Sequence, residues 1–151
     1  MTAPPRPEGP EDSPGFLLWT ITLDWQRRVT AALDPLGLTH VQFVLLASLH
    51  WLTMDPAGAP PSQRQLAEHA GTDIAMTSTV LRVLERHKLI ERRTDPSDAR
   101  VRRLTPTRAG RELAVVAMKI VEAVDHDFFA QAGDRARTMA VLQALAPGSF
   151  S

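Results

Sequence analysis

The sequence contains no cysteine among its 151 residues. This absence excludes disulfide bonds, thiolate zinc sites, cysteine nucleophiles and any thiol-based redox switch. The chain also lacks a run of ~18 to 20 apolar residues that could cross a bilayer, and its proline-rich, acidic beginning is not typical of a signal peptide. We therefore expect a cytoplasmic protein with no membrane partner.

The chain also has a net charge of zero, since 17 basic side chains balance 17 acidic ones. Taken alone, a neutral chain argues weakly against a nucleic-acid partner. Its distribution argues the other way, because residues 62–111 carry eleven basic and six acidic side chains, a net charge of +5. Such a basic segment in an otherwise acidic chain is typical of a surface that binds nucleic acid, although charge alone is equally compatible with a merely solvated surface.

The order of predicted elements indicates a mainly α-helical protein with a small β-wing. Residues 1–14 hold five prolines and are expected to form a disordered tail before one domain over residues 15–151. Within that domain, helix patterns at 16–34 and 111–146 flank a winged helix-turn-helix at 36–110. Its wing is a hairpin of strands at 90–93 and 100–104, because the intervening Asp-Pro-Ser-Asp is strong turn chemistry.

Helix caps can be read at several positions. Thr39 and Ser62 are expected to cap the second and third helices, and either Thr72 or Asp73 the fourth. The first helix is apolar on two sides and must be buried on both, in a core or against another subunit. The long helix from Thr107, with Val116 among its apolar residues, is longer than packing against the winged helix-turn-helix requires.

A helical wheel separates two sides of the fourth helix. Leu81, Leu84 and Ile74 fall on the inward side together with Thr77 and Val80. The opposite arc holds small, methyl-bearing, hydroxyl and guanidinium groups and no acid, which suits a helix that reads the major groove. The alternative is an ordinary surface helix with two solubilising arginines. The expected DNA-contacting residues of this helix are Ala75, Met76, Thr77, Ser78, Thr79, Arg82 and Arg86.

The wing offers a second contact. Arg100 follows the hairpin tip, where a guanidinium can enter an A·T-rich minor groove. Asp98, two residues earlier, could hold it by a charge-assisted hydrogen bond. The alternative is that Asp98 caps a turn and Arg100 is a solvated strand residue. Ser62 and Gln63 at the start of the third helix and Arg102 on the return strand complete the expected DNA-binding set.

These motifs together resemble the MarR family of bacterial transcription regulators. The resemblance is carried by residues 38–46 (LTHVQFVLL), 65–67 (QLA), 76–85 (MTSTVLRVLE), 89–92 (LIER), 95–100 (DPSDAR) and 107–110 (TRAG). Two positions depart from the family pattern: Pro106 replaces a usual leucine, and Lys88 replaces a common glycine. Lys88 must either accept the left-handed backbone that glycine favours or end the helix differently.

The resemblance implies a homodimer with interleaved terminal helices, which reads a palindromic double-stranded DNA operator with two recognition helices. It further implies repression relieved by a small aromatic or phenolic effector. Trp19, Trp25, Phe43 and Trp51 are the residues expected to line an effector crevice, although each of them also fits an ordinary core position. No cofactor and no metal site are expected.

Two other functions compete with that of a DNA-binding regulator. An enzyme or metal site would have to use Glu122 and residues 125–127, and a single helical histidine among carboxylates is more often a solvated surface pair. We therefore expect no enzyme. The second alternative is a winged-helix module that binds protein instead of DNA, since fold does not settle function; the arginine-rich wing argues against it.

Overall fold

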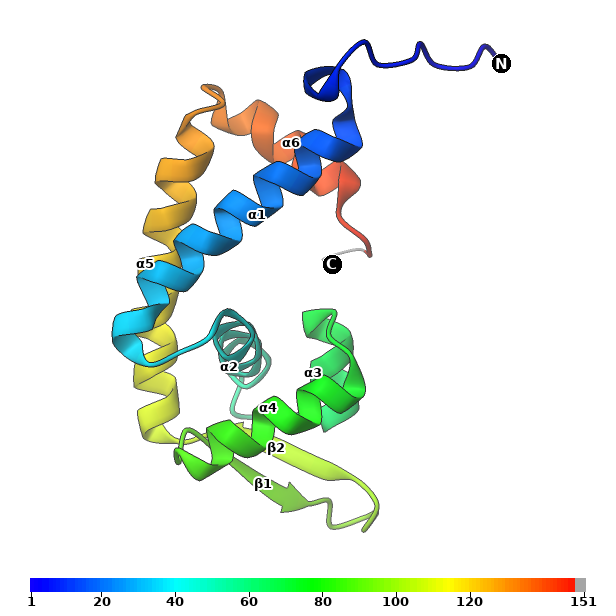
Figure 1. The fold of residues 1–151 in the computed structure, drawn as a ribbon. Coiled ribbons are helices and arrows are strands. Elements are labelled where there is room, and N and C mark those ends of the chain that lie inside the picture. The colour runs from blue at the N-terminus through cyan, green and yellow to red at the C-terminus, as the bar shows by residue number, and fades with distance from the viewer. Residues whose placement is uncertain (149–151) are drawn as a thin grey trace.

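The computed structural model describes residues 1–148. Residues 40–106 form one group, the lobe, and residues 14–33 and 135–145 form the second group. The long helix at residues 108–130 joins the two groups (Figure 1). In chain order the elements are a 3-10 turn at Pro10–Asp12, α1 (Pro14–Leu33), a 3-10 turn at Asp34–Leu36, α2 (His40–Leu52), α3 (Gln63–Ala70), α4 (Ile74–Arg86), β1 (Ile90–Thr94), β2 (Arg102–Pro106), α5 (Arg108–Ala130) and α6 (Arg135–Leu145). The predicted class, mainly α with a small wing, is confirmed. Within these residues no single helix could span a membrane, and only α1 with its following turn and α2, bent by 77° between them, reach the required length and apolarity together.

Two helices of the lobe begin with the caps predicted from the sequence. Thr39 accepts a hydrogen bond from the Gln42 amide nitrogen, and the Gln42 side chain accepts one from Thr39 N in return. Ser62 and Gln65 form the same reciprocal pair at the start of α3, with distances of 3.1 and 2.8 Å. Each pair satisfies two amide groups that the first turn of a helix leaves without partners.

The N-terminal tail is shorter than its composition suggests. A 3-10 turn occupies Pro10–Asp12, and α1 starts at Pro14, two residues before the expected position. The reason is a local cap, because the Ser13 hydroxyl accepts a hydrogen bond from Phe16 N at 3.3 Å and proline suits the first position of a helix.

Apolar side chains from α1 to α5 form one core around α2. In Figure 1, α2 lies at the centre of the lobe, and it contacts α3, α4, α5 and β2. The residues buried in this core include Val29, Leu33, Leu45, Leu46, Leu49, Leu66, Leu81, Leu84, Ile90 and Leu104. Because α4 and the wing pack against the same helix, their relative positions are fixed by this shared core.

The wing is an antiparallel pair in which Arg93 lies opposite Arg103 and Thr94 opposite Arg102. The second strand begins at Arg102, later than expected, because Val101 N donates to Asp98 O at 3.0 Å and so belongs to the tip. A backbone bridge between Ser62 and Arg103 also ties the hairpin to the segment before α3.

The long helix α5 joins the lobe to the second group, and it contacts the lobe closely at Gly110 in its first turn. A Cβ on Gly110 would lie 1.9 Å from the Leu89 carbonyl oxygen, so only glycine fits there. The buried side of α5 is made of small residues, Ala114, Ala117 and Val121, which let α1 and α2 approach closely. Val116, one of the apolar residues of this helix, is exposed.

Apolar side chains on α1 and α6 are left uncovered in the single chain. In α1 only Val29 and Leu33 are buried, and in α6 no residue is. An open groove between these helices is lined by Leu17, Leu18, Ile21, Phe128, Phe129, Val141, Leu142 and Leu145. The two-sided apolar pattern of the first helix is therefore not satisfied by the core of one chain.

Candidate nucleic-acid interface

A tight turn sets the angle between α3 and α4. Gly71 ends α3 in the left-handed conformation with φ of 69°, a backbone that glycine adopts without strain. The sequence left Thr72 and Asp73 as alternative caps, and the structure shows that Asp73 caps α4, its carboxylate accepting from Met76 N at 2.9 Å. Thr72 N donates to Ala67 O at 3.0 Å instead. These are the two helices of the expected helix-turn-helix.

The outer side of α4 carries the residues that the wheel placed there. Its exposed side chains include Ala75, Met76, Thr79, Arg82 and Arg86, and Ser78 is half-buried. The only carboxylate within α4, Glu85, lies 3.6 Å from the Arg92 guanidinium on β1, away from this row. A row of small, methyl-bearing and guanidinium groups without an acid can approach base edges and phosphates closely.

Two residues of α4 stand apart: Thr77, which the wheel placed inward although it was also expected to contact DNA, and Ile74. Thr77 is fully buried, and its hydroxyl donates to Asp73 O at 2.6 Å and lies 2.7 Å from Thr72 Oγ1. Its inclusion among the DNA-contacting residues is wrong, because these contacts hold the turn together from inside. Ile74, assigned to the inner side, is 51% exposed, since the first turn of α4 projects beyond the core.

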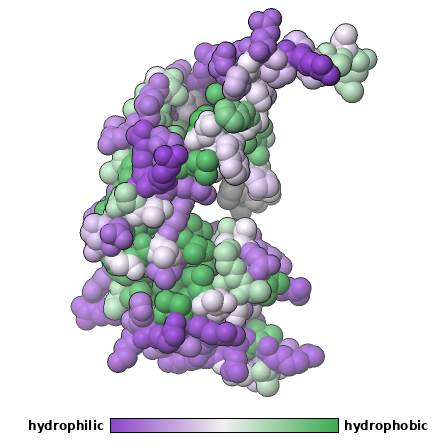
Figure 2. Space-filling model, viewed as in Figure 1, coloured by the Kyte–Doolittle hydropathy of each residue, from purple (hydrophilic) through white to green (hydrophobic). Residues whose placement is uncertain are grey.

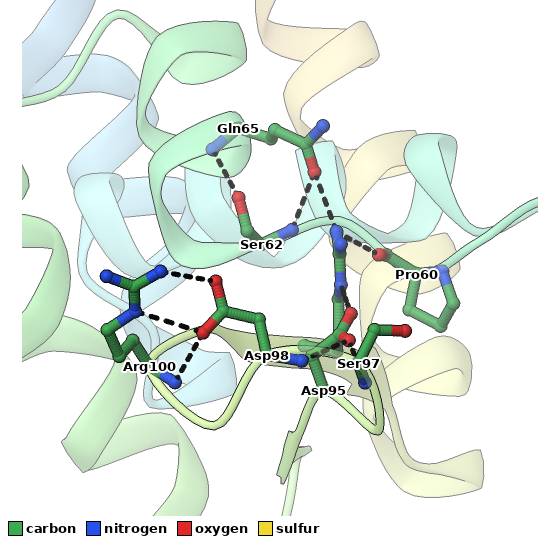
Figure 3. A network of polar contacts seen from close by, with 8 residues as sticks. Pro60, Ser62, Gln65, Asp95, Ser97, Asp98 and Arg100 are labelled. Atoms are coloured by element: carbon green, nitrogen blue, oxygen red, sulfur yellow. Dashed lines mark hydrogen bonds and ion pairs between the residues drawn. The ribbon is translucent and has the colours of Figure 1, made fainter.

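The wing tip presents one arginine outward. Arg100 Nε and Nη2 donate to Asp98 Oδ1 and Oδ2 at 3.1 and 3.3 Å, and Arg100 N also donates to Asp98 Oδ1 at 3.0 Å (Figure 3). The predicted contact between these residues is thus present. The Arg100 hydrogen bonds lower the pKa of Asp98 below its ordinary value. The Arg100 side chain remains 90% exposed, so its charge is held in place at the surface.

The start of α3 lies beside the wing. Ser62, Gln63, Ile74, Arg100 and Arg102 line one open groove together with Arg64 and Arg103. Figure 2 shows hydrophilic side chains along the lower face of the molecule, where Figure 1 places α4 and the wing. The structure therefore brings Ser62, Gln63, Arg100 and Arg102 to one surface. It adds five residues that were not predicted to contact DNA: Arg64, Gln65, Ile74, Val101 and Arg103.

Some of these side chains already have partners within the chain. Gln63 Oε1 accepts from Arg92 Nη1 at 3.1 Å, and Arg102 Nη1 donates to Thr94 Oγ1. Arg92 was not predicted as a site residue. It is a half-buried arginine among charged neighbours in β1, and alternation of inward and outward residues along that strand would have pointed to it.

The four aromatic residues proposed for an effector crevice do not share one environment. Trp19 and Trp51 are exposed, whereas Trp25 and Phe43 pack against the core. Trp25 joins three helices, since its ring lies 5.1 Å from that of His40 on α2 and its Nε1 donates to Asp125 Oδ1 on α5 at 2.7 Å. An effector crevice remains a prediction for these residues.

The alternative metal cluster lacks the required geometry. Among residues 1–148 no group of three or more His, Asp or Glu side chains is placed to hold a metal ion. Asp125 accepts the Trp25 hydrogen bond, and His126 lies 3.3 Å from Asp127 at the exposed surface.

Known proteins are similar to this chain over most of its length. The MarR family model matches residues 38–101. The chain is 44% identical over 137 residues to the uncharacterized HTH-type transcriptional regulator YdcH of Bacillus subtilis, which covers 91% of this chain and 92% of YdcH. It is 37% identical over 116 residues to the HTH-type transcriptional repressor Rv2887 of Mycobacterium tuberculosis, covering 76% of this chain and 79% of the repressor.

Solved structures agree with this similarity. Rv2887 in complex with DNA is 31% identical with a TM-score of 0.69, covering 89% of this chain and 98% of that chain, and the same protein has been solved with salicylic acid. CouR from Rhodococcus jostii bound to p-coumaroyl-CoA is 26% identical with a TM-score of 0.77, covering 96% and 99% of the two chains. The chain belongs to the MarR family of HTH-type transcriptional regulators.

Proposed function

We propose that the protein is a homodimeric repressor that binds a palindromic operator in double-stranded DNA. In this proposal α4 enters the major groove and Arg100 enters the neighbouring minor groove. The observation that carries it is the acid-free outer row of α4, which stands beside a wing whose arginine is held by Asp98 and yet 90% exposed. The related Rv2887 has been solved in complex with DNA, which supports DNA as the partner.

The uncovered helices α1 and α6 support the proposed dimer. The groove between α1 and α6 exposes the apolar side chains of Leu17, Leu18, Ile21, Leu142 and Leu145. A second copy of the chain would cover it, and a two-fold axis would place two α4 helices on successive major grooves of one duplex face.

We further infer that a small aromatic acid or thioester relieves repression. Rv2887 with salicylic acid and CouR with p-coumaroyl-CoA support this chemical class. Trp25 is the most suggestive of the predicted lining residues, because it joins α1, α2 and α5 at the junction between the lobe and the dimer helices. A repressor of this kind works in the cytoplasm, on the chromosome.

A titration of duplex DNA tests the proposal against a protein-binding winged-helix module. A fragment from beside the protein's own gene should bind more tightly than a shuffled fragment. The logarithm of affinity should fall linearly with that of salt concentration, with a slope of about −0.9 per neutralised phosphate. Arg86→Ala should weaken binding, whereas Arg27→Ala on α1 removes the same charge without effect. Equal affinity for both fragments, or no binding at low salt, would favour the protein-binding alternative.

A further inference from the structure

Arg103 is, with Arg92, one of two wing arginines whose side chains turn toward the body of the lobe. It is 31% exposed, whereas Arg93, directly across the hairpin, is 80% exposed. Arg103 Nε donates to Asp95 Oδ2 at 2.7 Å, and Nη1 donates to both Pro60 O and Gln65 Oε1 at 3.2 Å. These donors are therefore occupied within the chain.

The three acceptors belong to three different parts of the lobe. Pro60 lies in the loop after α2, Gln65 in the first turn of α3, and Asp95 in the turn of the wing. Gln65 Oε1 also accepts from Ser62 N at 2.8 Å, so the Arg103 guanidinium joins the capping box of α3. Figure 3 shows Pro60, Ser62 and Gln65 on one side of this network and Asp95 and Asp98 on the other.

Asp95 carries the contact onward to the wing tip. Its Oδ1 accepts from Ser97 N at 2.7 Å and from Asp98 N at 3.2 Å. Asp98 in turn holds Arg100 by three hydrogen bonds. The hydrogen bond from Arg103 is also the largest cause that lowers the pKa of Asp95 below its ordinary value.

We propose that Arg103 is a positioning residue that couples the wing to the helix-turn-helix, so that Arg100 is presented at a fixed place relative to α3 and α4. The coupling runs from the α3 capping box through Arg103 and Asp95 to Asp98 and Arg100. Arg103 acts through Arg100 and is not itself a DNA contact. This inference rests on the proposed function, because it assigns Arg103 a part in reading DNA.

The test compares duplexes that share the bound site but carry either A·T or G·C pairs where the wing lies. Arg100→Ala is expected to lose the preference for A·T flanks. Arg103→Ala should lose it as well, and Arg103→Lys should restore part of it. Arg93→Ala is the matched control, since it removes the same charge from the opposite strand position; it should weaken both duplexes equally and keep their ratio.

Epistasis separates positioning from direct contact. In an Arg100→Ala background, Arg103→Ala should change the flank ratio no further, whereas an additional loss would make Arg103 an independent contact and overturn the proposal. Asp95→Asn provides a second route if Arg103→Ala does not fold, because its remaining amide oxygen can still accept the turn hydrogen bonds; an unchanged ratio there would also overturn it. Failure of the unaltered protein to bind either duplex would instead contradict the proposed function itself.

Discussion

The absence of a Cβ at Gly110 lets the first turn of α5 pack directly against the backbone of the lobe. Gly110→Ala would place a Cβ 1.9 Å from the Leu89 carbonyl oxygen, and backbone on both sides must shift to relieve the overlap. We expect a loss of about 1–3 kcal/mol in the free energy of unfolding, as for other overpacked sites, measured by urea denaturation. Gly15→Ala is the control: nothing lies near its added Cβ, so the better helix former should stabilise by up to about 1 kcal/mol. Equal effects of the two substitutions would contradict this account.

The sequence leaves open whether Lys88 accepts a left-handed backbone or ends the helix differently, and the structure shows the first. Lys88 adopts the left-handed backbone with φ of 59°. Since this conformation costs a non-glycine residue ~1 kcal/mol or more, Lys88→Gly should raise the free energy of unfolding by up to about 1 kcal/mol. Lys88→Ala keeps the Cβ and should leave it nearly unchanged. Destabilisation by glycine in thermal or urea unfolding would show that the strain is not there.

At the scale of an element, α4 is expected to read bases through Arg82. An arginine that pairs with guanine discriminates at one base pair by about 1–3 kcal/mol. Binding of Arg82→Ala to a panel of duplexes with single base changes should therefore lose discrimination at one symmetric pair of positions and keep it elsewhere. A uniform loss over the whole panel would instead reassign Arg82 to a phosphate.

Within the helices and the wing, contacts between residues close in the sequence could be predicted, and contacts between distant residues could not. Caps such as Thr39 and Ser62 were predictable because their hydrogen bonds join residues three apart, and the Asp98–Arg100 pair is equally local. The exposure of Ile74 was not predictable, because a wheel gives direction around a helix and not where the core ends along it. The role of Arg103 was hidden for another reason, since its partners Pro60 and Gln65 lie about forty residues away in the sequence.

At the scale of the whole molecule, His40 lies where α1, α2 and α5 meet. Burial lowers the pKa of His40 below 6.5, with Asp125 acting in the opposite direction. The unfolded chain therefore takes up a proton more readily, so the stability is fully present above pH 6.5 and falls as the pH decreases toward the folded pKa. Urea denaturation between pH 7.5 and 5.5 should show this loss, and His40→Gln should reduce it. An identical pH dependence in both proteins would exclude His40 as its source.

The uncovered groove between α1 and α6 predicts the assembly. Leu18→Glu places a charge on the apolar surface that a second copy would bury, at a side chain that is 60% exposed in the single chain. Sedimentation should find the unaltered protein as a dimer and this variant as a folded monomer with weakened DNA binding. Thr30→Glu on the exposed side of α1 outside this set is the control and should remain dimeric. A Leu18→Glu variant that stays dimeric would place the interface elsewhere.

Selection of bound sequences from a random pool of DNA duplexes tests the central claim most directly, because it requires α4, the wing and the dimer at once. The account predicts enrichment of an inverted repeat whose half-site centres lie about 10 base pairs apart, one helical turn, or a multiple of it. It also predicts A·T-rich flanks where Arg100 enters the minor groove. Recovery of no sequence above the starting pool, or of a single unrepeated element, would contradict it.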